Sequence, residues 1–386
     1  MDGLSPVPPP PWQRVLCVRL DNLGDLLMTT PALAAVRHTL PRAHITLLTS
    51  PSAAAAAPHL PMVDAVWPFA APWCAQPDID GRLDGRELTL IAELASARFD
   101  AALIFTVCTQ SALPAALVCR MAGIPVRVAH SRENAYGLLT HALPETDAVL
   151  PGLPIAEQQQ RARHEVQRQL DLSAALGLHT PDDRLRFAVH AADRVRVRQQ
   201  LQHAGLSAGA PYAVLHPGAT AASRRWPPAS FGSAAAQLAA RGCAVVFAGS
   251  SGDAAWADEA LQAVPPRLRQ DPGVVSLAGT QTLGELAALI AGAEVVVANN
   301  SAAAHLAAAV DTPVVDLYAL TNPQHTPWRV AAHVLHHDVP CRWCLKSVCP
   351  EGHHACLRGV APEQAVSAAL ELMQTHARPR RTETSA

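Results

Sequence analysis

Short apolar runs alternate with alanine-rich stretches along most of the chain. The runs that predict β-strands are residues 15–20, 45–48, 101–105 and 126–128, followed later by 212–216, 244–248, 274–276, 294–298 and 314–318. The stretches between them, such as residues 32–40, have the composition of helices. This alternation is typical of βαβ units, so the pattern predicts an α/β fold with parallel sheets.

The alternation is interrupted once, by a polar helical segment at residues 157–176 and a charged stretch at 181–186. A chain of 386 residues is long enough for two domains of about 100–200 residues each. We therefore expect an N-terminal domain at residues 13–186 and a C-terminal domain at residues 187–376. The proline-rich segment 1–12 and the tail 377–386 are expected to be disordered.

The composition of the chain limits the class of molecule that it can bind and its expected place in the cell. The formal net charge is -2 and the isoelectric point is near 6.8, which argues against a nucleic-acid partner. No apolar run reaches the roughly 20 residues of a transmembrane segment, and the start of the chain lacks the pattern of a signal peptide, so we expect a cytoplasmic protein. Lys346 is the single lysine, so a side-chain cation that binds phosphate has to be an arginine.

The first candidate site follows the first predicted strand, in the segment from Arg19 to Asp25. Gly24 permits a tight turn, and with Asn22 it forms a loop at the edge of the predicted sheet. Asp25 falls near the start of the next helix, where it is a candidate catalytic carboxylate. The alternative is that Asp21, Asn22 or Asp25 only caps this helix.

The second candidate site is the loop after the predicted strand 212–216. Gly218 and Thr220 lie in a small-residue loop whose backbone N–H groups can face a phosphate, and Arg224 can supply positive charge. Asp253, after the next strand, could bind a ribose hydroxyl or could simply begin a helix.

The third candidate site contains Asn300, Ser301 and His305, at a predicted strand end and in the helix that follows. Unpaired N–H groups and the helix dipole at such a position favour a diphosphate. Alternatively, Asn300 and Ser301 cap the helix and His305 packs in the core.

Four of the nine cysteines crowd together as Cys341, Cys344, Cys349 and Cys356. Four thiolates can close a tetrahedral structural zinc site, although the second pair lacks the usual CxxC spacing. A loop of free thiols is the alternative.

These segments together resemble glycosyltransferase family 9, the ADP-heptose:lipopolysaccharide heptosyltransferases. The resemblance runs from about residue 15 to residue 371. It includes the opening motif at residues 18–33, the His-Pro-Gly loop with its basic residues before Trp-Pro, and the Asn-x-Ser-x-x-x-His segment at residues 299–309.

The resemblance implies a GT-B fold, in which two doubly wound Rossmann-like domains face a central cleft. The N-terminal domain would bind the acceptor and the C-terminal domain the nucleotide sugar. Asp25 matches the family's proposed catalytic base, Arg224 a basic position that contacts the donor phosphates, and Asp253 an acidic position near the ribose.

The implied activity is transfer, with inversion, of heptose or a related sugar from an ADP-linked donor to the lipopolysaccharide core or another glycan, free or lipid-linked. No cofactor would be required. Peripheral contact with the cytoplasmic face of the inner membrane is an open possibility.

The chain also departs from the family. Asn300 and Ala302 stand where family members commonly carry aspartate and glycine. One alternative is therefore a nucleotide-sugar-binding member whose activity is lost or redirected. A GT-B-like epimerase would not explain the opening motif, and a dehydrogenase is disfavoured because no strand is followed by a G-x-G-x-x-G turn.

Overall fold

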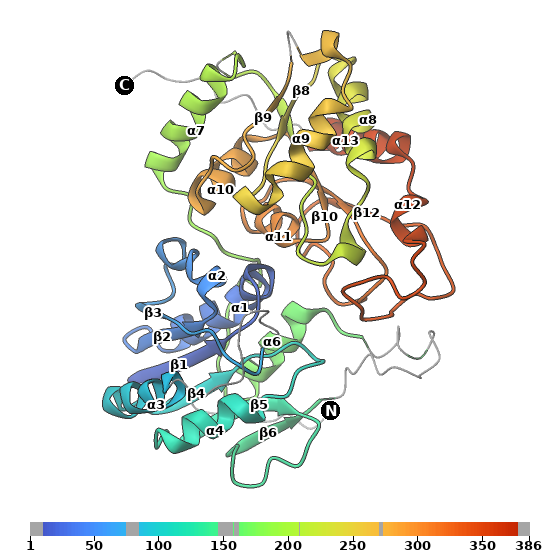
Figure 1. Cartoon of the computed structure of the whole chain (residues 1–386). Coiled ribbons are helices and arrows are strands. Elements are labelled where there is room, and N and C mark those ends of the chain that lie inside the picture. Colours follow the sequence, from blue (N-terminus) through green and yellow to red (C-terminus); the bar gives the residue numbers. More distant parts are fainter. Residues whose placement is uncertain are drawn as a thin grey trace. The chain divides into compact units, whose positions relative to one another are not determined.

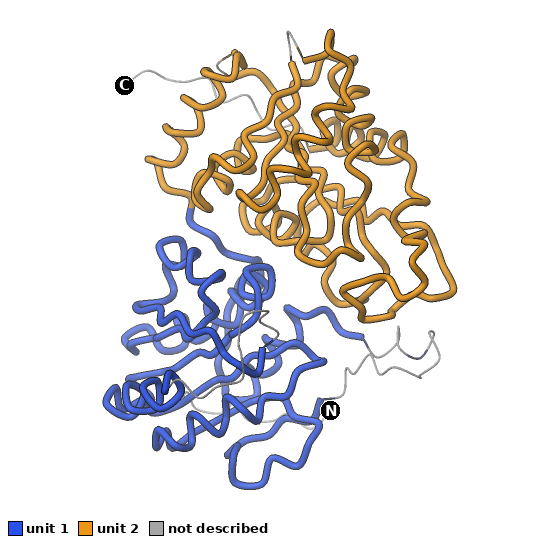
Figure 2. Tube along the Cα trace, in the orientation of Figure 1, with its two compact units in different colours: residues 1–188 blue, residues 189–386 orange. Residues whose placement is uncertain are grey.

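The computed structural model describes residues 11–74, 85–145, 157, 162–207, 209–269 and 273–376. The chain divides into two compact units, residues 1–188 and 189–386 (Figure 2). The expected disordered tail 377–386 lies outside the described residues, as does the proline-rich start except for residues 11 and 12.

The first unit is built on a parallel sheet with the strand order β3-β2-β1-β4-β5-β6 (Figure 1). Its strands are β1 (Arg14–Arg19), β2 (His44–Thr49), β3 (Ala65–Pro68), β4 (Ala101–Ile104), β5 (Val126–Ser131) and β6 (His141–Pro144). Its helices are α1 (Leu23–Thr39), α2 (Pro51–Ala54), η1 (Ala57–His59), α3 (Arg86–Ala97), α4 (Leu113–Met121) and α6 (Glu165–Ala174).

The second unit contains a parallel sheet with the order β12-β11-β10-β7-β8-β9. Its strands are β7 (Tyr212–His216), β8 (Ala244–Phe247), β9 (Val274–Ser276), β10 (Val295–Asn299), β11 (Val314–Leu317) and β12 (Ala332–Leu335). Its helices are α7 (Ala191–His203), η2 (Ala222–Arg224), α8 (Pro228–Ala239), η3 (Ser251–Asp253), α9 (Ala254–Gln262), η4 (Pro266–Arg269), α10 (Leu283–Gly292), α11 (Ala302–Ala309), α12 (Ala355–Arg358) and α13 (Pro362–Thr375).

The two sheets share one topology. Counted in chain order within each unit, both have the order 3-2-1-4-5-6 of the doubly wound dinucleotide-binding fold. The order reverses between β1 and β4 in the first sheet and between β7 and β10 in the second. Ligands of such sheets bind at the carboxyl ends of the strands beside this switch point, so each unit has one predicted binding edge.

Both faces of the second sheet are covered by helices. Leu215, Phe247 and Val297 pack in one core cluster with residues of α8, α9 and α13. Val246 and Val296, which point to the opposite face, are equally buried. The prediction of an α/β protein with two doubly wound domains is confirmed. None of the helices in the described ranges is long and apolar enough to span a membrane.

Candidate functional site

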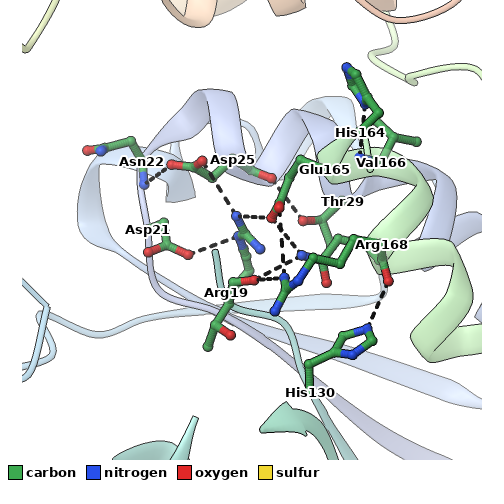
Figure 3. A network of polar contacts seen from close by, with 12 residues as sticks. Arg19, Asp21, Asn22, Asp25, Thr29, His130, His164, Glu165, Val166 and Arg168 are labelled. Atoms are coloured by element: carbon green, nitrogen blue, oxygen red, sulfur yellow. Dashed lines mark hydrogen bonds and ion pairs between the residues drawn. The ribbon is translucent and has the colours of Figure 1, made fainter. Parts of the chain in front are cut away.

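A buried arginine organises the carboxyl end of β1. The Arg19 side chain is fully buried, and its Nε lies 3.0 Å from an oxygen of Asp21. Its terminal nitrogen Nη2 lies 3.5 Å from Asp25 Oδ1 and 3.0 Å from Glu165 Oε1 (Figure 3). Arg19 therefore joins the loop after β1 to helix α6.

A second arginine extends the cluster on α6. Arg168 is ion-paired with Glu145, lies 3.7 Å from Glu165, and donates to the carbonyl of Thr106, which follows β4. Its own carbonyl contacts His130 Nε2 at 3.0 Å (Figure 3).

The described cluster sets two guanidinium groups, of Arg19 and Arg168, against four carboxylates. Burial raises the pKa of Asp21 to about 6; the negative charges of Asp25 and Glu165 add to this rise, and Arg19 opposes it.

Asp25 is the third residue of α1. Its Oδ2 accepts a 3.2 Å hydrogen bond from the backbone N–H of Asn22, and its side chain is 15% exposed. The capping contact is therefore present, while the other oxygen, Oδ1, faces Arg19. Gly24 lies in the first turn of the same helix, and Asn22 is exposed just before it. The catalytic role of Asp25 stays a prediction.

A pocket of about 260 Å³ opens at the switch point of the first sheet, where Asp21 after β1 and Phe105 after β4 line it. Its wall includes Trp73, Thr109 and Gln110. An apolar wall with a few convergent polar groups is typical of small-ligand sites, and an aromatic ring with a carboxylate suits a saccharide. Asp25 is not among the lining residues.

Asn299 holds together the two loops at the switch point of the second sheet. Its amide Nδ2 donates to the carbonyl of Pro217 at 2.7 Å, and its Oδ1 accepts from the N–H of Trp226 at 2.9 Å. Asn299 is fully buried at the end of β10. It therefore links the His-Pro-Gly loop after β7 to the Asn300–Ser301 segment.

The two neighbouring arginines of this loop have different surroundings. Arg225 donates to the carbonyls of Ala219 and Thr220, at 2.7 and 3.2 Å, and its guanidinium stacks on Trp256. Arg224, in contrast, has a buried Nε with no hydrogen-bond partner among the described residues. Arg225 thus shapes the loop, with Thr220 exposed on it, and Arg224 is the arginine left for a ligand.

Asp253 has a structural contact of the kind expected at a helix start. Its Oδ2 accepts from the N–H and the hydroxyl of Ser250, at 3.0 and 2.7 Å. The structure also packs it on Gly218, where a Cβ atom would lie 2.0 Å from Asp253 Oδ1. This close approach requires glycine at position 218. The ribose contact of Asp253 stays a prediction, and Oδ1 is the oxygen that Ser250 leaves for it.

Ser301 stands at the N-terminal cap of α11 without acting as a side-chain cap. Its Oγ accepts no backbone hydrogen bond, and it is buried without a partner in the described part of the chain. His305, on the same helix, is buried. Ser301 and Arg224 both leave polar atoms unused at this sheet edge, which favours a ligand there.

Asn300 is buried and directs its amide inward. Nδ2 donates to the carbonyl of His325 at 2.9 Å and lies 3.4 Å from Asp316 Oδ2. Asp316, on β11, is fully buried, and this burial raises its pKa to about 8 against the opposing effects of the Asn300 hydrogen bond and the Arg224 charge.

This pKa predicts how stability depends on pH. The folded protein keeps the Asp316 proton up to about pH 8, whereas the unfolded chain releases it near pH 4, so the free energy of unfolding should fall between these values. Asp316→Asn removes the titration, and its melting temperature relative to wild type should therefore rise from about pH 5 to about pH 8.

Thermal unfolding of both proteins across this range measures the effect. Asp311→Asn, an exposed site with a positive φ that asparagine tolerates, is the control and should show no such trend. A constant difference between Asp316→Asn and wild type would contradict the prediction.

The four clustered cysteines carry no disulfide. Cys341 Sγ lies 3.8 Å from His353 Nε2, and no group of three or more His, Cys, Asp or Glu in the described ranges is arranged to hold a metal ion. Their loop supports the arginine loop, since Ser223 donates to the carbonyls of Ser347 and Lys346 at 3.0 and 2.7 Å. Structural zinc at Cys341, Cys344, Cys349 and Cys356 is not shown.

The sequence did not single out Asp316, Glu165 or Arg168 as functional residues, and Asn299 entered only as the first residue of the Asn-x-Ser-x-x-x-His segment. Asp316 offered one signal, a carboxylate inside an otherwise apolar predicted strand. Glu165 lies 146 residues from Arg19 in the chain, so only the tertiary structure reveals their contact.

A family model and curated relatives are similar to most of this chain. A model of glycosyltransferase family 9 (heptosyltransferase) matches residues 88–355. The chain is 28% identical to lipopolysaccharide heptosyltransferase 3 of Escherichia coli over 313 residues, 79% of this chain and 83% of that protein.

Two solved structures are similar over nearly the whole chain. The glycosyl transferase family 9 protein from Veillonella parvula DSM 2008 matches with a TM-score of 0.76 and 19% identity, covering 94% of this chain and 98% of that one. E. coli ADP-heptose lps heptosyltransferase II matches with a TM-score of 0.72 and 23% identity, covering 95% and 100%. At these identities the likeness concerns the fold, and the predicted GT-B class is confirmed.

Proposed function

This chain belongs to glycosyltransferase family 9, and from that premise we propose that it transfers heptose or a related sugar from an ADP-linked donor to the lipopolysaccharide core or another glycan, with inversion. The names of its relatives support heptose as the sugar and lipopolysaccharide as the acceptor class. We place the reaction in the cytoplasm, with contact at the inner membrane face as part of the proposal.

The observation that carries the donor side of this proposal is the pair of unused polar atoms, Arg224 Nε and Ser301 Oγ, at one sheet edge. Breaking the bond between an anomeric carbon and a diphosphate leaves negative charge on the leaving group. A guanidinium and the N–H groups at the start of α11 can stabilise that charge. No cofactor is part of this proposal.

On the acceptor side, the first unit supplies a carboxylate and a pocket. We assign Asp25 as the base that takes the proton of the acceptor hydroxyl, and the pocket lined by Asp21 and Trp73 as the place of the acceptor sugar. Arg19 holds both carboxylates, so it fixes the base relative to the pocket.

Thermal shift with ADP-, GDP-, UDP- and dTDP-sugars tests the donor assignment, because a ligand at about 100 times its Kd stabilises by about 2.7 kcal/mol. We expect the ADP-sugars to give the largest shift, and ADP-heptose to be consumed when a lipopolysaccharide-core acceptor is added. Donor binding without transfer to any acceptor would support a binding protein that lacks turnover.

Arg224→Ala should weaken ADP binding by about ten- to a hundredfold and adenosine binding hardly at all, since a hydrogen bond to a charged group is worth about 1.5–3 kcal/mol. Calorimetry with both ligands measures this. Arg225→Ala is the matched variant. It loses the contacts to the carbonyls of Ala219 and Thr220, so it should lower the melting temperature. It should not weaken ADP binding more than adenosine binding. The reverse pattern would transfer the phosphate contact to Arg225.

A further inference from the structure

The orientation of the Asn300 amide decides which atom it offers to a ligand. Its Nδ2 group donates to His325 O at 2.9 Å and lies 3.4 Å from Asp316 Oδ2. The carbonyl oxygen of His325 can only accept, so the NH₂ group has to point inward. Both side-chain hydrogen bonds of Asn300 in the described part of the chain use Nδ2, so the other atom of the amide, Oδ1, is left for a ligand.

Asn300 directly follows β10 and precedes Ser301, at the edge where Arg224 Nε and Ser301 Oγ are also unused. Only 4% of Asn300 is exposed, so Oδ1 is held in one place. A neutral, fixed acceptor beside a diphosphate site suits a hydroxyl of the sugar that the diphosphate carries.

We propose that Asp316 is a positioning residue for donor-sugar recognition: it holds the amide of Asn300 so that Oδ1 accepts a hydroxyl of the sugar. This rests on the proposed function. Asn300 and Asp316 then form a matched pair, in which an amide meets the ligand and the carboxyl group that holds it lies one strand away, on β11.

The buried pair explains why asparagine can stand at position 300. An aspartate there would place a carboxylate oxygen against the carbonyl oxygen of His325, with no donor for that contact. Among the described residues, the positive charge of Arg224 acts on Asp316, and Tyr318 is a neighbouring titratable group. If residue 300 lost the NH₂ group that points to His325 and Asp316, the side chain that meets the sugar would no longer be held in place.

The test compares ADP with ADP-heptose by calorimetry. The sugar increment, defined as the Kd for ADP divided by the Kd for ADP-heptose, isolates contacts to the sugar. Asp316→Ala should lower it by about fivefold, and Asp316→Asn, which keeps an acceptor, should change it by less than about twofold. Asn300→Ala should lower it by about tenfold, and adding Asp316→Ala should cause no further loss, because Asp316 acts through Asn300.

Three results would overturn the inference: equal losses for ADP and ADP-heptose, an additive double variant, or an increased sugar increment in Asn300→Asp. The last would mean that position 300 favours a carboxylate. Asp316→Leu replaces Asp316→Ala if the latter does not fold, and Asp311→Asn is the exposed control. If wild type bound neither ADP nor ADP-heptose, the proposed donor would be wrong, which is distinct from failure of the Asn300–Asp316 pair.

Discussion

Asp25→Asn should reduce sugar transfer by about a hundredfold or more while the affinity for the nucleotide sugar stays nearly unchanged. Asparagine has the same shape, and its amide oxygen can still accept the N–H of Asn22, so the start of α1 should be preserved. The amide cannot take a proton from the acceptor hydroxyl. The turnover number at saturating donor, together with the Kd for the donor, separates the two effects.

Asp21→Asn is the natural comparison, because Asp21 shares Arg19 with Asp25 and lines the pocket. If Asp25 is the base, Asp21→Asn should mainly raise the KM for the acceptor. A larger fall in turnover for Asp21→Asn than for Asp25→Asn would assign the base to Asp21. Donor affinity lost in parallel with turnover in Asp25→Asn would indicate a structural role.

Central strands could be predicted from the sequence, and three edge strands could not. The pattern predicted β1, β4, β7 and β10, whose residues are buried except at the first position of β1. It missed β3, β6 and β12, which lie at sheet edges and have no fully buried residue. An edge strand has a weaker apolar signal because one side of it meets solvent.

Candidate site residues could be proposed where the local sequence carries the chemistry. Loop chemistry points to Arg224 and helix-terminus chemistry to Ser301, and the structure leaves a polar atom of each without a partner among the described residues. The amide orientation of Asn300 was not predictable, because it depends on His325 and Asp316, which come from other segments. Contacts between distant segments follow from packing, which a local pattern does not encode.

Arg19→Leu should destabilise the first unit by about 3–5 kcal/mol, the usual cost of removing one partner from a buried ion pair. Leucine fills part of the space but leaves Asp21 and Glu165 without their shared cation, and their side chains are only 5% and 0% exposed. The control is Arg186→Leu, whose partner Asp182 lies 3.3 Å away in an exposed pair. That variant should lose no more than about 1 kcal/mol.

The dependence on pH shows whether the Arg19 effect is one of charge. Arg19 opposes the raised pKa of Asp21, so without Arg19 the folded protein should hold the proton on Asp21 at pH values where the unfolded chain has released it. The folded state then binds more protons, so its stability falls as pH rises, and the gap in melting temperature to wild type should widen between about pH 5 and about pH 8. Calorimetric melting of both variants measures this. A gap of equal size at both pH values would mean that Arg19 contributes packing instead of balancing the carboxylates at the end of β1.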